Sequence, residues 1–476
     1  MRADCKITRG GFLKAMGAMG AAAAFPRAFA NASGAGAPGA RLKFGVLSDV
    51  HLKNPGDEAT FLKALEYFRD NGADGVLIAG DIADTGRAAE LKICADSWYR
   101  IFPGGKAPDG RPVVQLFVYG NHDMDGWRWK PNAERYRANP ELQKTDALGF
   151  ENNRARVWEE LFHEKYEPIW MKRVKGFTFI GAHWGDIRIE EFMKAHGKEI
   201  DPSLPFFYTQ HAHPKNTCFG SWAWGHDDGR STRALSPFPN AVAFSGHSHY
   251  TLTDERTVWQ GAFTSINTSS LKYSSTDYAL RENMPGNGYG YKGEGRRHLM
   301  PNVPTSNGRQ GMLVSVFADH IAIERREFVT GRSLGDDWVL PLPCAESKPF
   351  AYAAHARRRT APEFVDGAVP KVTETKDAKK GRLLEITFPA AQTRGKCRVF
   401  EYEVTAVLIE DDVDLVQLQR RVFAQDFHMP EAKDGAPGRC MIAAADLPMK
   451  GRYRFEVRPI ECFGLKGRAI SAEFAV

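Results

Sequence analysis

Five short polar motifs, each placed directly after an apolar run, constrain this chain more than any other feature. The motifs are Asp49-Val50-His51, Gly80-Asp81, Gly120-Asn121-His122-Asp123, Gln210-His211-Ala212-His213 and Gly246-His247-Ser248-His249. The runs before them are Phe44–Leu47, Val76–Ala79, Val113–Tyr119, Pro205–Thr209 and Ala241–Phe244. Short, continuous, β-branched apolar runs are typical of strands that are covered on both faces. We therefore expect a buried sheet with a polar motif at the end of each of these strands.

The segments between the runs predict helices. In 58–71 the apolar residues Phe61, Leu65 and Phe68 recur at helical spacing, and 88–102 shows the same pattern. Strands that alternate with helices indicate an α/β fold with several parallel strand pairs. In such sheets ligands bind beyond the carboxyl ends of the strands, so one cleft can collect all of the motifs.

The motif side chains offer carboxylate, amide and imidazole donors and no thiolates. This donor set suits Mn, Fe or Zn in a hydrolytic site, whereas a structural zinc site would use cysteine. Gly80 leaves room beside Asp81, whose carboxylate can bridge two cations. Each motif alone is weak, since a turn, a helix cap or an incidental surface or core histidine is the more common explanation. We assign Asp84 to the N-cap of the helix expected over 88–102. Together, in one order, the motifs favour a two-metal hydrolytic site.

The motif order D-x-H, G-D, G-N-H-D, a single His and G-H-x-H resembles that of the calcineurin-like metallophosphoesterase superfamily, over about residues 42–330. The resemblance implies an α/β sandwich with mixed sheets and two divalent or mixed-valence metal ions, Mn, Fe or Zn. The residues that it assigns to the first metal are Asp49, His51, Asp81 and His249. Those assigned to the second are Asp81, Asn121, His211 and His247, with Asp81 bridging. His122 would face the substrate and protonate the leaving group.

The single histidine of the pattern has two candidates, His211 and His213. We favour His211 because it directly follows the apolar run. His183, which follows the strand-like segment Phe177–Ala182, is a further candidate that we assign to the cleft wall or to the core.

Charge balance supports a phosphate-ester substrate. Two divalent cations and two ligating carboxylates leave a net +2, which can hold a hydroxide and an anionic phosphoryl group. We expect an enzyme that hydrolyses a small phosphomonoester or phosphodiester by attack of metal-bound hydroxide, with substrate-binding residues still unknown. The alternatives are a nuclease and a non-catalytic binding or adhesion protein that keeps the fold.

The formal net charge of +6 is mostly local, because residues 1–30 carry a net +4. A nucleic acid partner is therefore not expected, and no specific protein partner is indicated. The basic start, the apolar segment Ala15–Phe25 and the sequence Ala28-Phe29-Ala30 predict a signal peptide over 1–30, followed by a linker over 31–41. We expect export to the periplasm or beyond the cell. No apolar segment reaches the ~18 residues of a transmembrane helix.

The C-terminal third changes character. After the predicted phosphoesterase domain (42–341) and a linker (342–365), residues 366–476 alternate apolar and polar side chains. Examples are Leu384, Ile386 and Phe388, then Phe400, Tyr402, Val404 and Ala406 with the polar neighbours Glu401 and Glu403. This pattern predicts antiparallel sheets packed face to face, and it resembles a fibronectin type III or immunoglobulin-like β-sandwich. We interpret the region as an accessory module.

Two features stay open at this level. Cys344, Cys397, Cys440 and Cys462 could form disulfides in an exported protein, and three pairings are possible. The Gly/Tyr-rich segment 270–310 is either a wall of the cleft or a surface loop.

Overall fold

The computed structural model describes residues 39–185, 188–220, 225–275, 308–352, 360–379, 381–393, 398–410, 413–425, 435–447 and 449–476. The predicted signal peptide, most of the linker 31–41, most of the segment 270–310, part of the linker 342–365 and Cys397 lie outside the described residues. The predictions for these segments stay predictions, as do the domain boundaries.

Residues 42–341, called the α/β region below, contain two mixed β-sheets. The first has the strand order β12-β11-β10-β1-β2-β3, with β13 paired to β11. Its strands are β1 (Leu42–Leu47), β2 (Gly75–Ala79), β3 (Val114–Val118), β10 (Gln310–Val316), β11 (His320–Glu327), β12 (Arg332–Ser333) and β13 (Trp338–Pro341). Strands β1, β2 and β3 are parallel, so their carboxyl ends meet at one edge, and β10 runs antiparallel to β1.

The second sheet has the order β4-β5-β6-β7-β9-β8. Its strands are β4 (Ile169–Val174), β5 (Phe177–Ala182), β6 (Phe206–Thr209), β7 (Ala241–Ser245), β8 (Val258–Gln260) and β9 (Thr264–Asn267). Strands β5, β6, β7 and β9 are parallel, and β4 and β8 are antiparallel edges. The predicted α/β fold with mixed sheets is confirmed, and the apolar runs before the motifs coincide with β1, β2, β3, β6 and β7.

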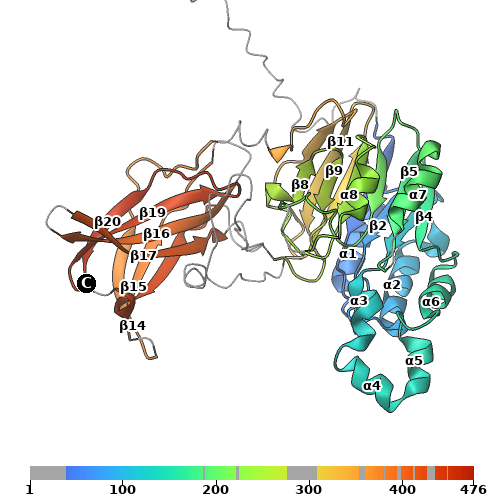
Figure 1. Cartoon of the computed structure of the whole chain (residues 1–476), viewed down its shortest axis with the longest axis horizontal. Coiled ribbons are helices and arrows are strands. Elements are labelled where there is room, and N and C mark those ends of the chain that lie inside the picture. Colours follow the sequence, from blue (N-terminus) through green and yellow to red (C-terminus); the bar gives the residue numbers. More distant parts are fainter. Residues whose placement is uncertain are drawn as a thin grey trace, which may run out of the picture. The chain divides into compact units, whose positions relative to one another are not determined.

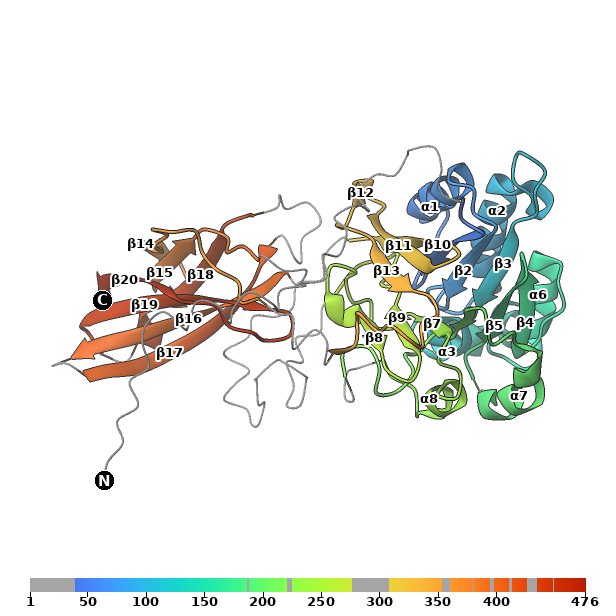
Figure 2. The same ribbon diagram turned by 90° about the horizontal axis from the view of Figure 1, so that it is seen from above.

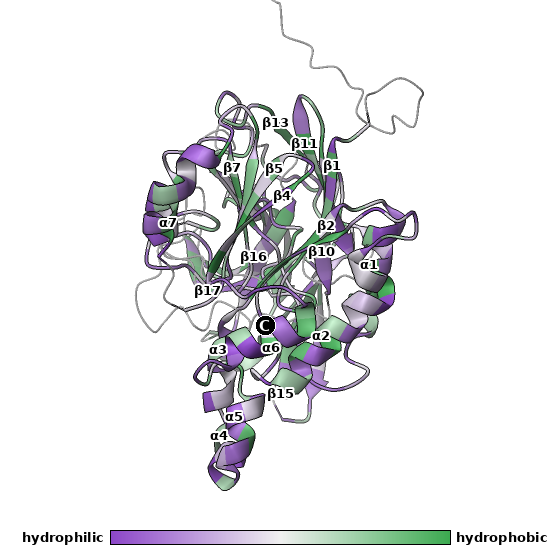
Figure 3. Ribbon diagram, turned by 90° about the vertical axis from the view of Figure 1, so that its right-hand side faces the viewer, coloured by the Kyte–Doolittle hydropathy of each residue, from purple (hydrophilic) through white to green (hydrophobic). Residues whose placement is uncertain are grey.

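An apolar core lies between the two sheets. The ring of Phe44 on β1 contacts Phe179, Phe207 and Phe244 of the second sheet at centroid distances of 5.1, 4.8 and 5.9 Å. Full burial of one such side chain stabilises the fold by about 1.5–3 kcal/mol. Figure 3 shows hydrophobic stretches on strands of both sheets, such as β2 and β7. This shared core fixes the carboxyl-end edges of the two sheets close to each other.

Helices cover the outer faces of both sheets (Figure 2). Those on the first sheet are α1 (Ala59–Asp70), α2 (Ala88–Ile101) and α6 (Asn153–Phe162), and those on the second are α7 (Ile189–His196) and α8 (Arg230–Leu235). Gly45 of β1 has no side chain, and this lets Phe68 of α1 pack directly on the strand. Three short helices follow β3: α3 (Asn121–Asp125), α4 (Asn132–Ala138) and α5 (Pro140–Asp146).

Residues 366–476, called the β region below, form two antiparallel sheets with the orders β14-β15-β18 and β17-β16-β19-β20 (Figure 1). The strands are β14 (Lys371–Asp377), β15 (Gly381–Phe388), β16 (Val399–Glu410), β17 (Val413–Phe423), β18 (Gly438–Ala443), β19 (Arg452–Glu461) and β20 (Ile470–Ala475). Leu384 and Ile386 of one sheet share a core with Tyr402 and Phe455 of the other. The predicted all-β architecture is confirmed, and the likeness to fibronectin type III or immunoglobulin domains stays a prediction.

The alternation on β16 differs from the expected pattern. Glu401 and Glu403 are buried, as are their apolar neighbours. Arg421 on the paired strand β17 explains this, because its guanidinium donates to Glu401 at 2.9 Å and to Glu403 at 2.6 Å. A buried carboxylate is tolerated where such a charged partner satisfies it.

The described cysteines, Cys94, Cys218, Cys344, Cys440 and Cys462, are buried. No disulfide joins Cys344, Cys440 and Cys462 to one another. Among the helices of the described residues, none combines the length and the apolar character that crossing a membrane requires.

Candidate metal centre

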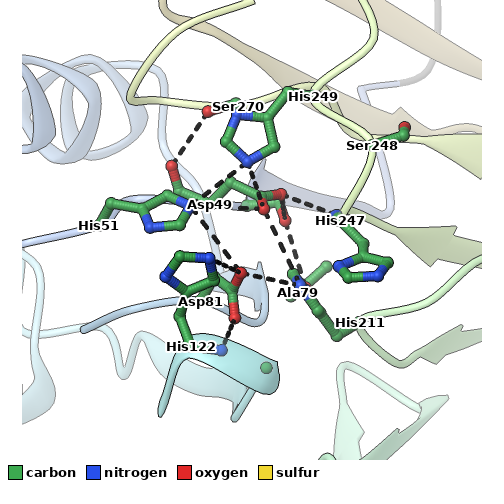
Figure 4. Close-up of polar contacts among 12 residues, drawn as sticks. Asp49, His51, Ala79, Asp81, His122, His211, His247, Ser248, His249 and Ser270 are labelled. Atoms are coloured by element: carbon green, nitrogen blue, oxygen red, sulfur yellow. Dashed lines mark hydrogen bonds and ion pairs between the residues drawn. The ribbon is translucent and has the colours of Figure 1, made fainter. Parts of the chain in front are cut away.

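The motif residues of both sheets converge at the carboxyl-end edge of the α/β region. Asp49, Asp81 and Asn121 follow β1, β2 and β3 of the first sheet. His211 follows β6 of the second sheet, and His247 and His249 follow β7. Figure 4 shows the carboxylates of Asp49 and Asp81 in the middle of the group, with imidazole rings around them. The structure thus brings together residues that are up to two hundred positions apart, such as His51 and His249, whose Nε2 atoms are 3.3 Å apart.

Backbone conformation at this edge is unusual. Five of the predicted ligands have positive φ angles: Asp49 (50°), His51 (50°), Asp81 (52°), His247 (73°) and His249 (58°). Left-handed conformations are costly for residues other than glycine, and they cluster where function demands a particular side-chain direction. Asp49-Val50-His51 and His247-Ser248-His249 are therefore not extended segments, in which residues two apart would point to the same side. Their left-handed residues direct the side chains toward the centre instead.

The glycines of the motifs make room for the ligand side chains. Gly80 has a φ of +92°, and a Cβ built on it would lie 2.5 Å from the His211 ring. A Cβ on Gly246 would collide with Ser48 and with the Asp49 carboxylate. A larger residue at either position would displace the ligand behind it.

Three groups of side chains have donor atoms close enough to bind a metal ion. They are Asp49 with His51 and His249, Asp81 with His211 and His247, and His51 with Asp81 and His122. The Oδ1 atom of Asp49 lies 3.0 Å from His249 Nε2, and the Oδ2 atom of Asp81 lies 3.0 Å from His211 Nε2. Asp81 belongs to two of the groups, which is the position that a bridging carboxylate requires.

Three buried polar atoms of the motifs lack a hydrogen bond of regular geometry: Asp49 Oδ1, Asn121 Oδ1 and His211 Nε2. Asp49 Oδ1 and His211 Nε2 each lie 3.0 Å from another side chain of the centre. An unsatisfied buried polar group costs about 1–3 kcal/mol, so a bound ion that these atoms coordinate would stabilise the folded protein. All three atoms are hard oxygen or imidazole donors, which suit divalent cations. The residues present therefore fit divalent metal ions.

The charges in the centre are strongly coupled. Burial alone would raise the pKa of the Asp49 carboxyl, but the charges of His249 and His211 outweigh burial and hold that pKa well below its usual range. Burial alone would lower the pKa of His51, but its contacts with Asp49 and Asp84 outweigh burial and raise the pKa to about 10. The pKa of His211 is likewise raised to about 9, because the charges of Asp81 and Asp49 outweigh burial. Metal ions would compete with protons for these nitrogens.

The structure separates the three candidates for the single histidine. His211 lies in the centre, with its Nδ1 hydrogen-bonded to the carbonyl of Ala79 at 2.7 Å and its Nε2 facing Asp81. His213 is buried, but its two ring nitrogens are hydrogen-bonded to the hydroxyls of Ser245 (2.7 Å) and Ser248 (2.8 Å). His183 Nδ1 accepts from the Tyr119 N–H at 3.0 Å, and its ring packs against Trp158. Only His211 of the three belongs to a group of potential ligands.

His122 stands at the start of α3 and is partly open to solvent. Its Nδ1 lies 2.7 Å from the carbonyl oxygen of Asp84, so this nitrogen carries the proton. The other ring nitrogen, Nε2, faces the Asp81 carboxylate at 3.9 Å. Burial lowers the pKa of His122 more than the nearby Asp81 raises it. The ring thus presents one nitrogen toward the centre and is fixed by the backbone through the other.

Asp84 corrects one sequence expectation. It does not cap a helix, because α2 begins at Ala88 and its N-cap residue is Arg87. The Asp84 carboxylate instead lies 3.2 Å from His51 Nδ1 and 2.9 Å from Lys53 Nζ. A carboxylate on the second nitrogen of a ligating histidine orients the ring and increases its basicity. In the sequence, the only hint of this role was that Asp84 follows Asp81 by three residues. The contact with His51 became visible only in the structure.

Comparison with protein families agrees with this geometry. Residues 42–251 match the family model described as Calcineurin-like phosphoesterase. They form a calcineurin-like phosphoesterase domain. The family and the ligand groups of this domain point to divalent metal ions.

The solved structures that match the chain share little sequence with it. A predicted phosphoesterase from Streptococcus pneumoniae is 12% identical with a TM-score of 0.27, and the match covers 63% of this chain and 97% of that protein. A dimetal phosphatase from Danio rerio is 12% identical (TM-score 0.32; 63% and 99% covered). Vps29 in complex with zinc from Entamoeba histolytica is 10% identical (TM-score 0.29; 63% and 99% covered). No curated protein matches the chain.

Proposed function

We propose that this protein is an exported phosphoesterase that uses two divalent metal ions to hydrolyse a small phosphomonoester or phosphodiester. The observation that carries the proposal is the convergence of six side chains, from four motifs on two sheets, into groups whose donor atoms are close enough to bind a metal ion: Asp49, His51, Asp81, His211, His247 and His249.

The residues divide into two binding positions. Asp49, His51 and His249 would hold one ion, and Asn121, His211 and His247 would hold the other, with Asp81 shared between them. Two such ions would activate a water molecule and stabilise the charge on the phosphoryl oxygens. The left-handed backbone at Asp49, His51 and Asp81 keeps the donor atoms aimed before the ions bind.

In its imidazolium form, in which both ring nitrogens carry a proton, His122 would protonate the leaving oxygen. Its Nδ1 is occupied by the carbonyl of Asp84, so Nε2 is the nitrogen that faces the substrate. Since general acid catalysis helps most when the leaving alkoxide is basic, His122 matters most for esters of ordinary alcohols. Export rests on the basic, apolar N-terminal segment of the sequence alone.

One experiment tests the proposal with a matched control. Metal-free protein is reconstituted with Mn²⁺, Fe²⁺ or Zn²⁺ and assayed against phosphomonoesters, linear and cyclic phosphodiesters and pyrophosphates. His211→Gln and His213→Gln change two buried histidines that are two positions apart, of which only His211 belongs to a ligand group. We expect His211→Gln to lose metal and turnover and His213→Gln to keep both. Absence of turnover on every substrate by the fully metal-loaded wild type would contradict the proposal.

A further inference from the structure

Two aromatic side chains are exposed at the metal centre. Within the described part of the chain, the exposed large apolar side chains include the aromatic residues Trp129 (39% exposed) and Tyr273 (40% exposed). The other members of that set are aliphatic residues. Large exposed rings are informative where they gather at one place, because burial would otherwise be favourable.

Both exposed rings pack on histidines of the centre, at opposite ends of one row of rings. Trp129 meets the ring of His122 edge-on at a centroid distance of 4.6 Å, and Tyr273 lies 4.3 Å from His249. Between them, His51 lies 4.3 Å from His122 and 5.1 Å from His249. Figure 4 shows His122, His51 and His249 along one side of the two carboxylates. Trp129 and Tyr273 therefore flank the centre.

Backbone hydrogen bonds hold both residues beside the centre. The Trp129 N–H donates to the carbonyl of Gly126 at 3.1 Å, which ties it to the turn that continues α3. The Tyr273 carbonyl lies 3.1 Å from Nδ1 of His249 and accepts its proton, and the Tyr273 N–H faces Ser270 Oγ at 3.3 Å. The positions of the two rings are thus set by the same segments that position His122 and His249.

We infer that Trp129 forms a wall of a leaving-group subsite beside His122, with Tyr273 at the far end of the row, and that the preferred substrates are phosphate esters whose leaving group carries a flat aromatic ring. The inference rests on the proposed function and specifies its substrate class. Trp129 is the main contact, since it adjoins His122, the residue that would protonate the leaving oxygen. Aromatic pairs gain from edge-to-face or offset stacking beyond the area that they bury, which corresponds to a preference of about two- to tenfold.

A matched substrate pair isolates the ring. 2-Phenylethyl phosphate and 2-cyclohexylethyl phosphate have leaving alcohols of similar size and basicity and differ in aromaticity. We expect wild-type protein loaded with Mn²⁺ to prefer the phenyl ester by about two- to tenfold in kcat/KM. Trp129→Ala should abolish this preference, mainly through KM, whereas Trp129→Phe should keep most of it. Adenosine 5′-phosphate compared with ribose 5-phosphate tests whether a nucleobase is the ring that the subsite takes.

Phe317→Ala is the matched control. Phe317 stacks on His320 at a centroid distance of 4.5 Å, and both lie at the turn between β10 and β11, at the opposite edge of the first sheet. This variant also removes an aromatic ring from a histidine, and it should leave the ester preference unchanged. If Trp129→Ala lowers turnover of both esters equally, Trp129 only supports His122, and the inference is overturned.

Binding separates failure of the inference from failure of the proposed function. Isothermal titration with phenylphosphonate and cyclohexylphosphonate, which are not hydrolysed, should show tighter binding of the aromatic compound to wild type and equal binding to Trp129→Ala. Equal binding of both compounds to wild type contradicts the aromatic subsite even if esters turn over. Preferential binding without turnover of any ester would support the subsite and contradict the phosphoesterase activity.

Discussion

Two buried aspartates stand at opposite ends of β2, and their surroundings differ completely. Asp74 immediately precedes the strand and Asp81 follows it by two residues. Both are about equally inaccessible to solvent, at 2% and 1% exposure. The same strand therefore presents one carboxylate at each edge of the sheet, and the difference between them separates a structural from a functional role.

Asp74 is surrounded by partners that satisfy it. It accepts from the Lys43 N–H at 2.9 Å, and its other oxygen lies 3.0 Å from both Arg111 Nη1 and Lys175 Nζ. Positive side chains neutralise its charge without any ligand, as buried carboxylates require. Nothing about Asp74 calls for a metal ion or a substrate.

Asp81 has a different environment. Its partners are the His122 N–H at 2.8 Å and the imidazole of His211 at 3.0 Å, and a second carboxylate, Asp49, lies in the same group of rings. Burial raises the pKa of Asp81, and the negative charge of Asp49 raises it further. The positive charges of His211 and His51 outweigh both effects, so the pKa of Asp81 lies below its usual value. Two ionised acids in one buried site are held by groups that can all bind metal. The contrast with Asp74 makes Asp81 a ligand position.

The largest expected effect follows from Asp81→Asn. We expect kcat/KM to fall by about 10³-fold or more, because losing a shared ion removes several kcal/mol of transition-state stabilisation. Mn²⁺ should raise the melting temperature of wild type but not of this variant, since only a bound ion stabilises the folded state. Calorimetric melting with and without Mn²⁺ measures this. If Mn²⁺ raises the melting temperature of Asp81→Asn as much as that of wild type, Asp81 is not a metal ligand and does not differ in role from Asp74.

His122→Ala should lower kcat by roughly 10²-fold on alkyl phosphates while the metal content stays that of wild type. The reason is that His122 donates a proton and its Nδ1 is already occupied by Asp84. Aryl phosphates with activated leaving groups should be affected less. Metal analysis beside steady-state kinetics decides the point, and loss of metal in this variant would make His122 a ligand.

Asp84→Asn should weaken metal binding by about tenfold. The amide keeps the shape of the side chain but loses the charge that supports His51. Asp57→Asn is the control, because Asp57 is an exposed carboxylate of the loop that carries His51, and it accepts from the N–H groups of Lys53 and Asn54. Competition with a chelator gives both affinities. Equal affinities for the two variants would show that Asp84 does not support its histidine.

The smallest effect on catalysis is expected at the other end of β2. Asp74→Asn should lower the free energy of unfolding by about 1–3 kcal/mol, since Arg111 and Lys175 lose a charged partner. Metal content and kcat/KM should stay those of wild type. Urea unfolding beside the activity assay tests this, and a loss of metal would mean that the two ends of the strand are coupled.

Much of the α/β region could be predicted from sequence for a physical reason. Strands of a sheet covered on both faces are continuous apolar runs, so Val76–Ala79 identifies β2 and the polar motif after it marks the edge of the sheet. The combination of weak motifs also identified the residues that converge, including His211. That residue could be preferred over His213 only because it directly follows its strand.

The remaining features depend on contacts between distant segments. The left-handed conformation of Asp49 and the contact between Asp84 and His51 arise when the two sheets and their loops are packed together. Burial of Glu401 needs Arg421, which lies on another strand. Trp129 belongs to no motif, so its position at the centre could be recognised only in the structure. Tyr273 lies in the segment 270–310, for which the sequence left a cleft wall and a surface loop open, and the structure places its ring beside His249.

The most direct test of the central claim is anomalous diffraction from crystals of the protein loaded with Mn²⁺. We predict two anomalous peaks about 3.5–4 Å apart at the carboxyl ends of β1, β2, β3, β6 and β7, with the Asp81 carboxylate between them. Asp49 Oδ1, Asn121 Oδ1 and His211 Nε2 should each point at one of the peaks. A single peak, or two peaks that leave Asn121 and His211 without a metal contact, would contradict the account.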